Sequence, residues 1–440
     1  MRRPLRFWLG LGGIALLAFA VRVALGLAAD VPNGLGDDVW YHWVANGLVD
    51  GRGFSDPFHS LGPHGIVFGS AGKPLPTAFH PPLFPMLLAG FSEVGLRSYT
   101  AHQIVGCALG AGTTVVLGLI GRRLAGERAG LLAALAGALF LPMAINEALL
   151  RSESLYGLTI ALVLLAAIHL RERPDARRAG LLGAAIGVAT ITRAEAILLL
   201  AMLAPLVVRA APRGWRRLGA CAAAAAVLVV PWSVRSSLEF DRPVFVATAD
   251  GSLIAGANLP STYHGELLGG WDFNGLSRTP TGRAGIRNEA VQSARWRREG
   301  FDFARHHAGR LPVVIAARVG RTWSVYPFSI AGRSPFTTAY RHLRRGAYLD
   351  LLVFIAVLAL AAYGFGALER GLRWLFLAPV VLVTLVSALG DGDTRFRQAA
   401  DVVVALLAGL GLARLLDRRA ARRAAAHATS SSISGSSGMR

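Results

Sequence analysis

The feature that most constrains this chain is its series of long runs of Leu, Ala, Val and Ile, each of roughly the length that crosses a lipid bilayer. Hydrophobic residues make up 53% of the 440 residues and charged residues only 16%, whereas about 25% is charged in a soluble domain. A segment in lipid must satisfy its backbone hydrogen bonds internally, and a single apolar run does so as a helix. The sequence therefore predicts an all-α polytopic membrane protein.

Basic residues outnumber acidic ones, and the formal net charge is +20. In a soluble protein this balance would indicate nucleic-acid binding. Here the basic residues lie in short loops between apolar runs, where the positive-inside bias places them. The charge therefore indicates topology, and we expect membrane lipid and no nucleic acid as a partner. Cys107 and Cys221 both lie in apolar runs, which argues against a disulfide framework.

The first apolar run follows a basic cap and is predicted to be an uncleaved span, residues 7–28, with the N-terminus inside. The basic loop 121–128 is predicted to be cytoplasmic, so the helix 101–119 before it runs from outside to inside. The 14-residue apolar segment 82–95 is too short to span and then stays outside, as an interfacial or re-entrant helix.

Alternation along the rest of the chain predicts about ten spans, within a range of nine to thirteen, with both termini cytoplasmic. The predicted spans are 7–28, 101–119, 131–145, 155–170, 181–191, 196–208, 218–234, 351–368, 375–389 and 400–416. Segment 311–325 carries Arg318 and Arg321, which would be costly in mid-span, and counting backwards from the C-terminus places it on the outer surface.

This reading divides the chain into six parts. They are the first transmembrane helix (1–29), a first outer loop with interfacial helices (30–98), a transmembrane bundle (99–235), a large outer region (236–348), C-terminal transmembrane helices (349–418) and a low-complexity, disordered cytoplasmic tail (419–440).

Asp37 and Asp38 follow the first span at the predicted water boundary and begin a segment whose apolar residues have helical spacing. Spacing alone favours two carboxylates that stabilise a helix N-terminus. For Glu153, which follows Ser152, a structural role at a helix N-terminus and a functional role have equal weight. For Arg395 and Arg397, a role as anchors at the membrane interface and a role as phosphate ligands have equal weight.

The string Asp37-Asp38-x-x-Tyr41, followed by Ala-x-x-Leu and Gly-x-Gly-Phe, resembles the lipid-linked-sugar glycosyltransferases of the GT-C superfamily. The branch it resembles most is that of the protein O-mannosyltransferases and aminoarabinose transferases. Further similar strings follow in the family's order along nearly the whole chain: AFHPPLFPMLLAGF (78–91), LRSESLY (150–156), TRAEAILLL (192–200) and DTRFRQAADVVVALLAGLG (393–411).

The resemblance implies that Asp37 is the essential carboxylate, which deprotonates or orients an acceptor hydroxyl. Asp38 stands where the family usually has Glu, and a second acid from the next outer loop usually faces the first. Glu153 is the candidate for that second acid, with Glu147 as its rival. The implied catalytic residues are therefore Asp37, Asp38 and Glu153, and Asp37 and Glu153 are the candidate ligands of a divalent metal, the only cofactor implied.

His80 takes the place of a lysine that contacts phosphate in the aminoarabinose branch, and Phe79 replaces an acid that can bind zinc there. Arg395 and Arg397 match an Arg-Tyr-x-x-Pro element, with Phe396 for Tyr and no Pro. The predicted substrate-binding residues are Tyr41, Lys73, His80, Arg193, Glu195, Arg395 and Arg397, with Arg318 and Arg321 as further phosphate candidates. The Asp-x-Asp at Asp391 and Asp393 is common by chance in a glycine loop and has low weight.

The implied activity is transfer of a hexose or pentose from a polyprenyl-phosphate donor to a hydroxyl of a protein, lipid or polysaccharide, at the outer face of a bacterial plasma membrane. The alternatives are a flippase or transporter of lipid-linked sugars, and an inactive scaffold. A transporter usually shows mid-membrane charges and an internal repeat, neither of which is clear here. No P-loop, His-Glu-x-x-His or Gly-x-Ser-x-Gly motif occurs, which argues against an ATPase, a metalloprotease and a hydrolase.

Overall fold

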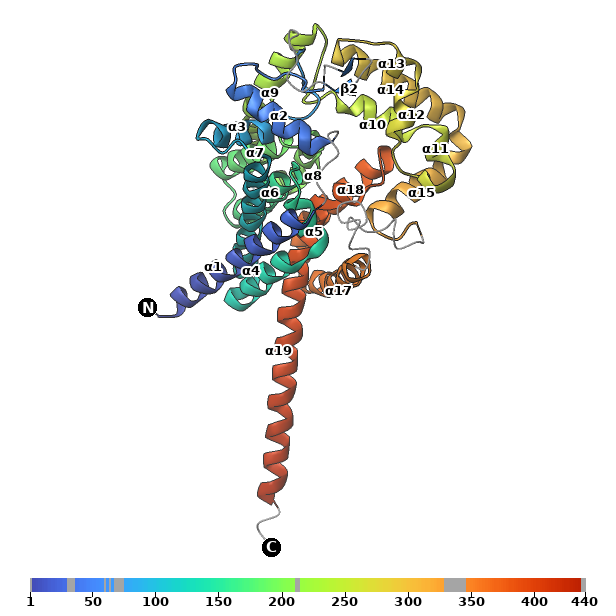
Figure 1. Cartoon of the computed structure of the whole chain (residues 1–440). Helices are drawn as coiled ribbons and strands as arrows, with labels where there is room; N and C mark the ends of the chain where they lie inside the picture. The colour runs from blue at the N-terminus through green and yellow to red at the C-terminus, as the bar shows by residue number, and fades with distance from the viewer. Residues whose placement is uncertain are drawn as a thin grey trace.

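The structure is a computed structural model that describes residues 2–29, 36–58, 61–62, 65–66, 75–209, 214–327 and 346–436. Its described part is helical apart from one small antiparallel pair, β1 (Leu61–Gly62) and β2 (Gly65–Ile66), in which Leu61 lies opposite Ile66. Figure 1 shows a bundle of long helices, with a group of shorter helices, α10 to α15, beside one end of it.

Seven helices in the described residues are long and apolar enough to cross a membrane. They are α1 (Arg2–Ala28), α4 (Tyr99–Leu139), α6 (Glu153–Glu172), α9 (Gly214–Phe240), α17 (Gly346–Ala367), α18 (Arg370–Leu389) and α19 (Gln398–Ser436). Helices α7 (Ala176–Thr190) and α8 (Leu198–Arg209) are shorter. The predicted class, an all-α polytopic membrane protein, is confirmed, whereas the number of spans stays a prediction.

Helix α4 consists of two helices that meet at a kink in the predicted cytoplasmic loop 121–128. Ala125 and Gly126 leave the helical conformation there, and Gly126 has a φ of 87°, which favours glycine. The second half of α4 therefore folds back beside the first.

The predicted span 131–145 is wrong in its second part, because the helix ends at Leu139 and Phe140 is extended. A new helix, α5 (Leu141–Ala148), starts with Pro142, whose missing N–H and fixed φ suit the first turn of a helix. Asn146 and Glu147, predicted to lie in an outer loop, are therefore helical and buried.

Small residues allow the helices of the bundle to approach closely. A Cβ atom at Gly183 of α7 would lie 1.9 Å from the carbonyl oxygen of Cys221 in α9. One at Gly411 of α19 would lie 2.1 Å from the carbonyl oxygen of Leu360 in α17. Without a hydrophobic driving force between helices in lipid, such close packing holds a bundle together, which accounts for the richness in Ala and Gly.

The two interfacial helices predicted in the first outer loop are α2 (Asp37–Val49) and α3 (Leu83–Glu93). They pack together through a small apolar core, in which Trp40 and Tyr41 of α2 contact Phe84 and Leu88 of α3. This packing fixes the start of α2, and with it Asp37, relative to the turn before α3.

The described part of region 236–348 is helical. It contains α10 (Ala249–Ala257), α11 (Pro260–Tyr263), α12 (Phe273–Ser277), α13 (Pro280–Arg283), α14 (Glu289–His306) and α15 (Leu311–Thr322), with short 3₁₀ turns η2 (Gly265–Leu267) and η3 (Ala308–Arg310). Helix α15 coincides with the ambiguous segment 311–325 and packs against α18.

The chain end differs from the disordered tail predicted for residues 419–440. Helix α19 continues to Ser436, and Figure 1 shows it extending far beyond the other helices. The composition of residues 417–426 accounts for the first part of this extension, since Ala and Arg are among the strongest helix formers, whereas the Ser-rich part that follows has no such preference. Residues 437–440 lie outside the described part.

Candidate functional site

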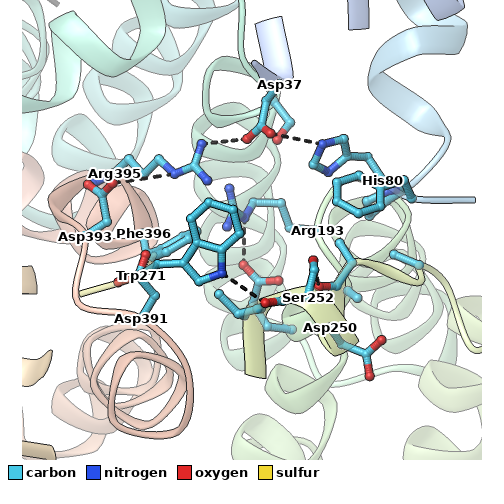
Figure 2. A pocket seen from close by; sticks show the side chains of 18 of the residues that line it. Asp37, His80, Arg193, Asp250, Ser252, Trp271, Asp391, Asp393, Arg395 and Phe396 are labelled. Atoms are coloured by element: carbon cyan, nitrogen blue, oxygen red, sulfur yellow. Dashed lines mark hydrogen bonds and ion pairs between the residues drawn. The ribbon is translucent and has the colours of Figure 1, made fainter. Parts of the chain in front are cut away.

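A cavity of about 620 Å³ lies where several long helices begin or end. This volume is in the range of small-molecule sites. The walls come from the start of α2, the turn before α3, the 3₁₀ turns η1 (Ala194–Ile197) and η6 (Thr394–Arg397), α10 and the loop before α12 (Figure 2). Among the lining residues are six predicted site residues: Asp37, Tyr41, His80, Arg193, Glu195 and Arg395.

Asp37 lies between the guanidinium group of Arg395 and the imidazole of His80, as Figure 2 shows. Its Oδ2 accepts a hydrogen bond of 2.6 Å from Arg395 Nη1, and its Oδ1 is 3.3 Å from His80 Nε2. Burial alone would raise the pKa of Asp37, but the charges and hydrogen bonds of Arg395 and His80 hold it well below its ordinary value. Asp37 is therefore an ionised carboxylate at neutral pH.

His80 is held by aromatic neighbours. Its ring stacks on Tyr41, with centroids 4.9 Å apart, and meets Trp40 edge-on at 4.8 Å. Its Nε2 atom is buried and lies 3.3 Å from Asp37 Oδ1. A fixed imidazole beside this carboxylate can also contact a ligand in the cavity.

Arg193 brings Glu153 and Glu195 together. Its Nη1 is 2.9 Å from Glu153 Oε1, and its Nε is 2.7 Å from Glu195 Oε1. Phe396 lies between two guanidinium groups, with Arg193 Cζ 5.1 Å and Arg395 Cζ 4.9 Å from its ring centroid. Glu153 thus borders the site through Arg193, although it does not line the cavity itself.

Other predicted residues do not face the cavity. Asp38 accepts a hydrogen bond of 2.9 Å from Tyr99 Oη. Arg397 is 1% exposed and binds Asp401 at 2.7 Å and the carbonyl of Thr322 at 2.9 Å. Lys73 lies outside the described residues.

The remaining candidates have structural partners. Glu147, the rival of Glu153, is buried in the bundle with Arg22. Arg318 is buried and donates to the carbonyl oxygens of Ala257 and Ala388. Arg321 alone among these lines the cavity.

Some lining residues had little or no sequence signal. Trp271, Asp250 and Ser252 belong to no motif considered above, and Asp391 and Asp393 had low weight. Only the fold brings the loop before α12 against the loop between α18 and η6, where the backbone N–H of Gly392 donates to Gly269 at 3.1 Å.

The divalent metal at Asp37 and Glu153 stays a prediction. In the structure each carboxylate faces an arginine, and no group of three or more metal-ligating side chains was found among the described residues. Carboxylates neutralised by guanidinium groups fit a divalent cation poorly, so no step below depends on one.

A buried carboxylate also supports the segment that carries His80. Glu289, at the start of α14, accepts hydrogen bonds from Thr77 Oγ1 at 2.7 Å, from the backbone N–H of Ala78 at 3.1 Å and from Thr248 Oγ1. It therefore ties the turn before α3 to the helical region beyond α9.

We expect this carboxylate to make stability depend on pH. Burial raises the pKa of Glu289 to about 7, above about 4.3 in an unfolded chain, so the folded state binds more protons between these values. The free energy of unfolding should therefore fall as pH rises through this window, by at most about 4 kcal/mol from Glu289. Thermal unfolding of wild type and Glu289→Gln between pH 4 and 8 should show a flatter profile for the variant. Identical profiles would contradict the assignment.

Comparisons with known proteins agree with this architecture. Residues 79–234 match the family model described as dolichyl-phosphate-mannose-protein mannosyltransferase. The oligosaccharyltransferase AglB from Archaeoglobus fulgidus, in complex with an inhibitory peptide and a dolichol-phosphate, matches 97% of this chain at 16% identity with a TM-score of 0.52. The Archaeoglobus fulgidus oligosaccharyltransferase in complex with Zn and sulfate matches 96% at 15% identity, also with a TM-score of 0.52. No curated protein matches the chain.

The chain spans about half the length of these oligosaccharyltransferases, 52% and 51% respectively. ArnT from Cupriavidus metallidurans bound to undecaprenyl phosphate gives a TM-score of 0.45 at 16% identity, with 92% of this chain and 77% of that chain covered. The family match and the shared fold confirm the resemblance to the GT-C superfamily. The chain is a multi-pass membrane protein with the GT-C fold.

Proposed function

We propose that this protein is a glycosyltransferase that moves a sugar from a polyprenyl-phosphate donor to an acceptor hydroxyl at the outer face of the membrane. The observation that carries the proposal is Asp37, a carboxylate held between Arg395 and His80 in the wall of a cavity at the ends of spanning helices. This arrangement offers the Asp37 carboxylate to a hydroxyl and the basic side chains around it to a phosphate.

The basic side chains can hold the phosphate that leaves. Arg193, Arg395 and His80 line the same cavity. Arg395 Nε is buried without a hydrogen bond to a described residue. Charge-assisted bonds from such donors to phosphate oxygens are short and strong. They would stabilise the negative charge that develops on phosphate as its bond to the sugar breaks.

Binding of phosphate would also change Asp37. Arg395 neutralises this carboxylate and lowers its pKa, which makes it a weak base. A phosphate that shares the Arg395 guanidinium would weaken this pairing and raise the pKa of Asp37. The acceptor oxygen then attacks the anomeric carbon, the bond from that carbon to the phosphate oxygen breaks, and the hydroxyl proton passes to Asp37.

The proposed sidedness rests on charge. Helices α6 and α8 begin, and α7 and α18 end, next to the cavity. The loops at their other ends are rich in arginine, for example in the segments 171–178 and 209–217. By the positive-inside bias those loops are cytoplasmic, so the cavity faces the outer side of the membrane. Both termini are then cytoplasmic, and the membrane is the plasma membrane of a bacterium. The acceptor could be a protein, a lipid or a polysaccharide.

Membranes that contain the protein would test the proposal when supplied with radiolabelled polyprenyl-phosphate sugars and extracts of possible acceptors. We expect label to pass from lipid to acceptor only when the protein is present. If purified protein instead moves labelled lipid across vesicles without an acceptor, it is a flippase. Absence of both activities would support an inactive scaffold.

Loss of Arg395 should mainly affect the donor. Replacing it by glutamine removes hydrogen bonds to a charged group, each worth about 1.5–3 kcal/mol, so kcat/KM for the donor should fall about 10- to 100-fold. Arg52→Gln is a suitable control, because Arg52 pairs with Asp50 on the surface and does not line the cavity. Equal kinetics for Arg395→Gln and wild type would show that Arg395 does not bind the phosphate.

A further inference from the structure

Part of the cavity wall has no role in the reaction as described so far. Trp271, Asp391 and Asp393 form this part, which we name the acidic wall, and Figure 2 shows them together near Phe396 and Arg395. Its chemistry differs from that around Asp37, because it adds two carboxylates and an indole to the guanidinium groups of Arg321 and Arg395.

The backbone of the acidic wall is fixed by close packing. Gly392 donates its N–H to the carbonyl of Gly269, and a Cβ atom at Gly392 would lie 2.5 Å from the carbonyl oxygen of Arg318. Gly269 has a φ of 76°, and a Cβ atom there would lie 2.7 Å from the backbone carbon of Ala317. The two loops can therefore pack on each other and on α15 only with glycine at these positions.

The indole of Trp271 is fixed as well. Its Nε1 donates a hydrogen bond of 3.0 Å to the carbonyl oxygen of Ser252, drawn in Figure 2. Gly256 makes room for it, because a Cβ atom there would lie 2.1 Å from Nε1. With its polar atom satisfied, the ring presents apolar surface to the cavity.

Asp391 is the unusual member of the wall. Its side chain lines the cavity and is only 9% exposed, yet no described residue forms a hydrogen bond or ion pair with it. Burial and the nearby Asp393 raise its pKa to about 7. Most of this side chain is removed from bulk water, so hydroxyls of a molecule bound in the cavity can complete the hydrogen bonding of its carboxylate.

We propose that the acidic wall is a subsite for a hydroxyl-rich sugar ring, with the apolar face of the ring on Trp271 and its hydroxyls donating hydrogen bonds to Asp391. A sugar ring has both surfaces, a face of C–H groups and a rim of hydroxyls, and the wall has the complement of each. This inference rests on the proposed function and adds where a sugar binds. The ring could belong to the donor or to a sugar acceptor.

Kinetics of the full-length protein in membranes would test the subsite, with the polyprenyl-phosphate sugar and the acceptor that wild type uses. We expect Trp271→Leu and Asp391→Asn each to raise KM at least tenfold for the substrate whose ring binds there. A rise for the donor, together with slower donor hydrolysis without acceptor, identifies the donor sugar. A rise for the acceptor alone identifies an acceptor sugar.

Binding of undecaprenyl phosphate, which has no sugar, separates recognition from folding. Both variants should bind it within twofold of wild type, as should the surface controls Trp215→Leu and Asp302→Asn. Loss of this binding in both variants would show that the wall only supports the fold, and an unchanged KM for both substrates would equally overturn the subsite. Failure of wild type to transfer any sugar would instead overturn the proposed function.

Discussion

Replacement of Asp37 by asparagine is expected to lower the rate of sugar transfer about 1,000-fold, within the range that a positioned general base contributes. Asparagine keeps the shape of the side chain but can neither carry the negative charge nor accept a proton at neutral pH. It also leaves Arg395 without the carboxylate that accepts its 2.6 Å hydrogen bond. Transfer of radiolabel from lipid to acceptor in membranes measures the effect, and kcat should fall more than donor affinity.

Asp38→Asn is the matched control, since Asp38 is the same residue type one position later and its carboxylate meets Tyr99 instead of the cavity. We expect it to keep transfer within about fivefold of wild type, because loss of one hydrogen bond costs about 1 kcal/mol. Full activity of Asp37→Asn would show that this carboxylate is not the base. Equal losses in both variants would indicate that the start of α2 matters only for folding.

Much of the site could be predicted because its residues lie in local strings next to predicted spans. Asp37 follows the first span directly, and Arg395 precedes the last one. Charge counting alone placed both on one side of the membrane, and the structure joins them by an ion pair across 358 positions of sequence. The class of fold could likewise be predicted, since apolar runs of spanning length have few alternatives in lipid.

Other features depend on packing that no local pattern reports. Arg397 matches the family string as well as Arg395 does, but the 3₁₀ turn η6 directs it away from the cavity towards Asp401. Trp271 enters the cavity because Gly256 leaves room for its indole, a relation between α10 and the loop before α12 that sequence spacing does not encode. The helical break at Phe140 was missed because an apolar run looks the same whether or not it is continuous.

The buried pair of Glu147 and Arg22 should have the largest effect on stability. Arg22 of α1 is fully buried; its Nε donates to Glu147 Oε2 at 2.7 Å and its Nη2 to the carbonyl of Gly137 at 3.0 Å. The other carboxylate oxygen of Glu147 accepts a hydrogen bond of 2.9 Å from Gln398, the first residue of α19. Four helices, α1, α4, α5 and α19, therefore meet at one ion pair inside the bundle.

Space for this pair is provided by glycine. A Cβ atom at Gly110 of α4 would lie 2.5 Å from Arg22 Nε, and one at Gly157 of α6 would lie 2.7 Å from Gln398 Nε2. Any larger residue at either position would push the charged groups apart. The pair and its surroundings are thus a single packed unit, and Gly110→Ala should weaken it as well.

Glu147→Ala is expected to destabilise the protein by about 3–5 kcal/mol, because it leaves the Arg22 guanidinium buried without a counter-charge. Thermal unfolding in detergent and the yield from membranes should both fall. The double variant Arg22→Met, Glu147→Leu should recover most of the loss, since replacing a buried ion pair by apolar residues of similar volume is often neutral. If the single variant unfolds like wild type, the pair does not hold these helices together. If the double variant is as unstable as the single one, the loss of stability is due to packing and not to the unpaired charge.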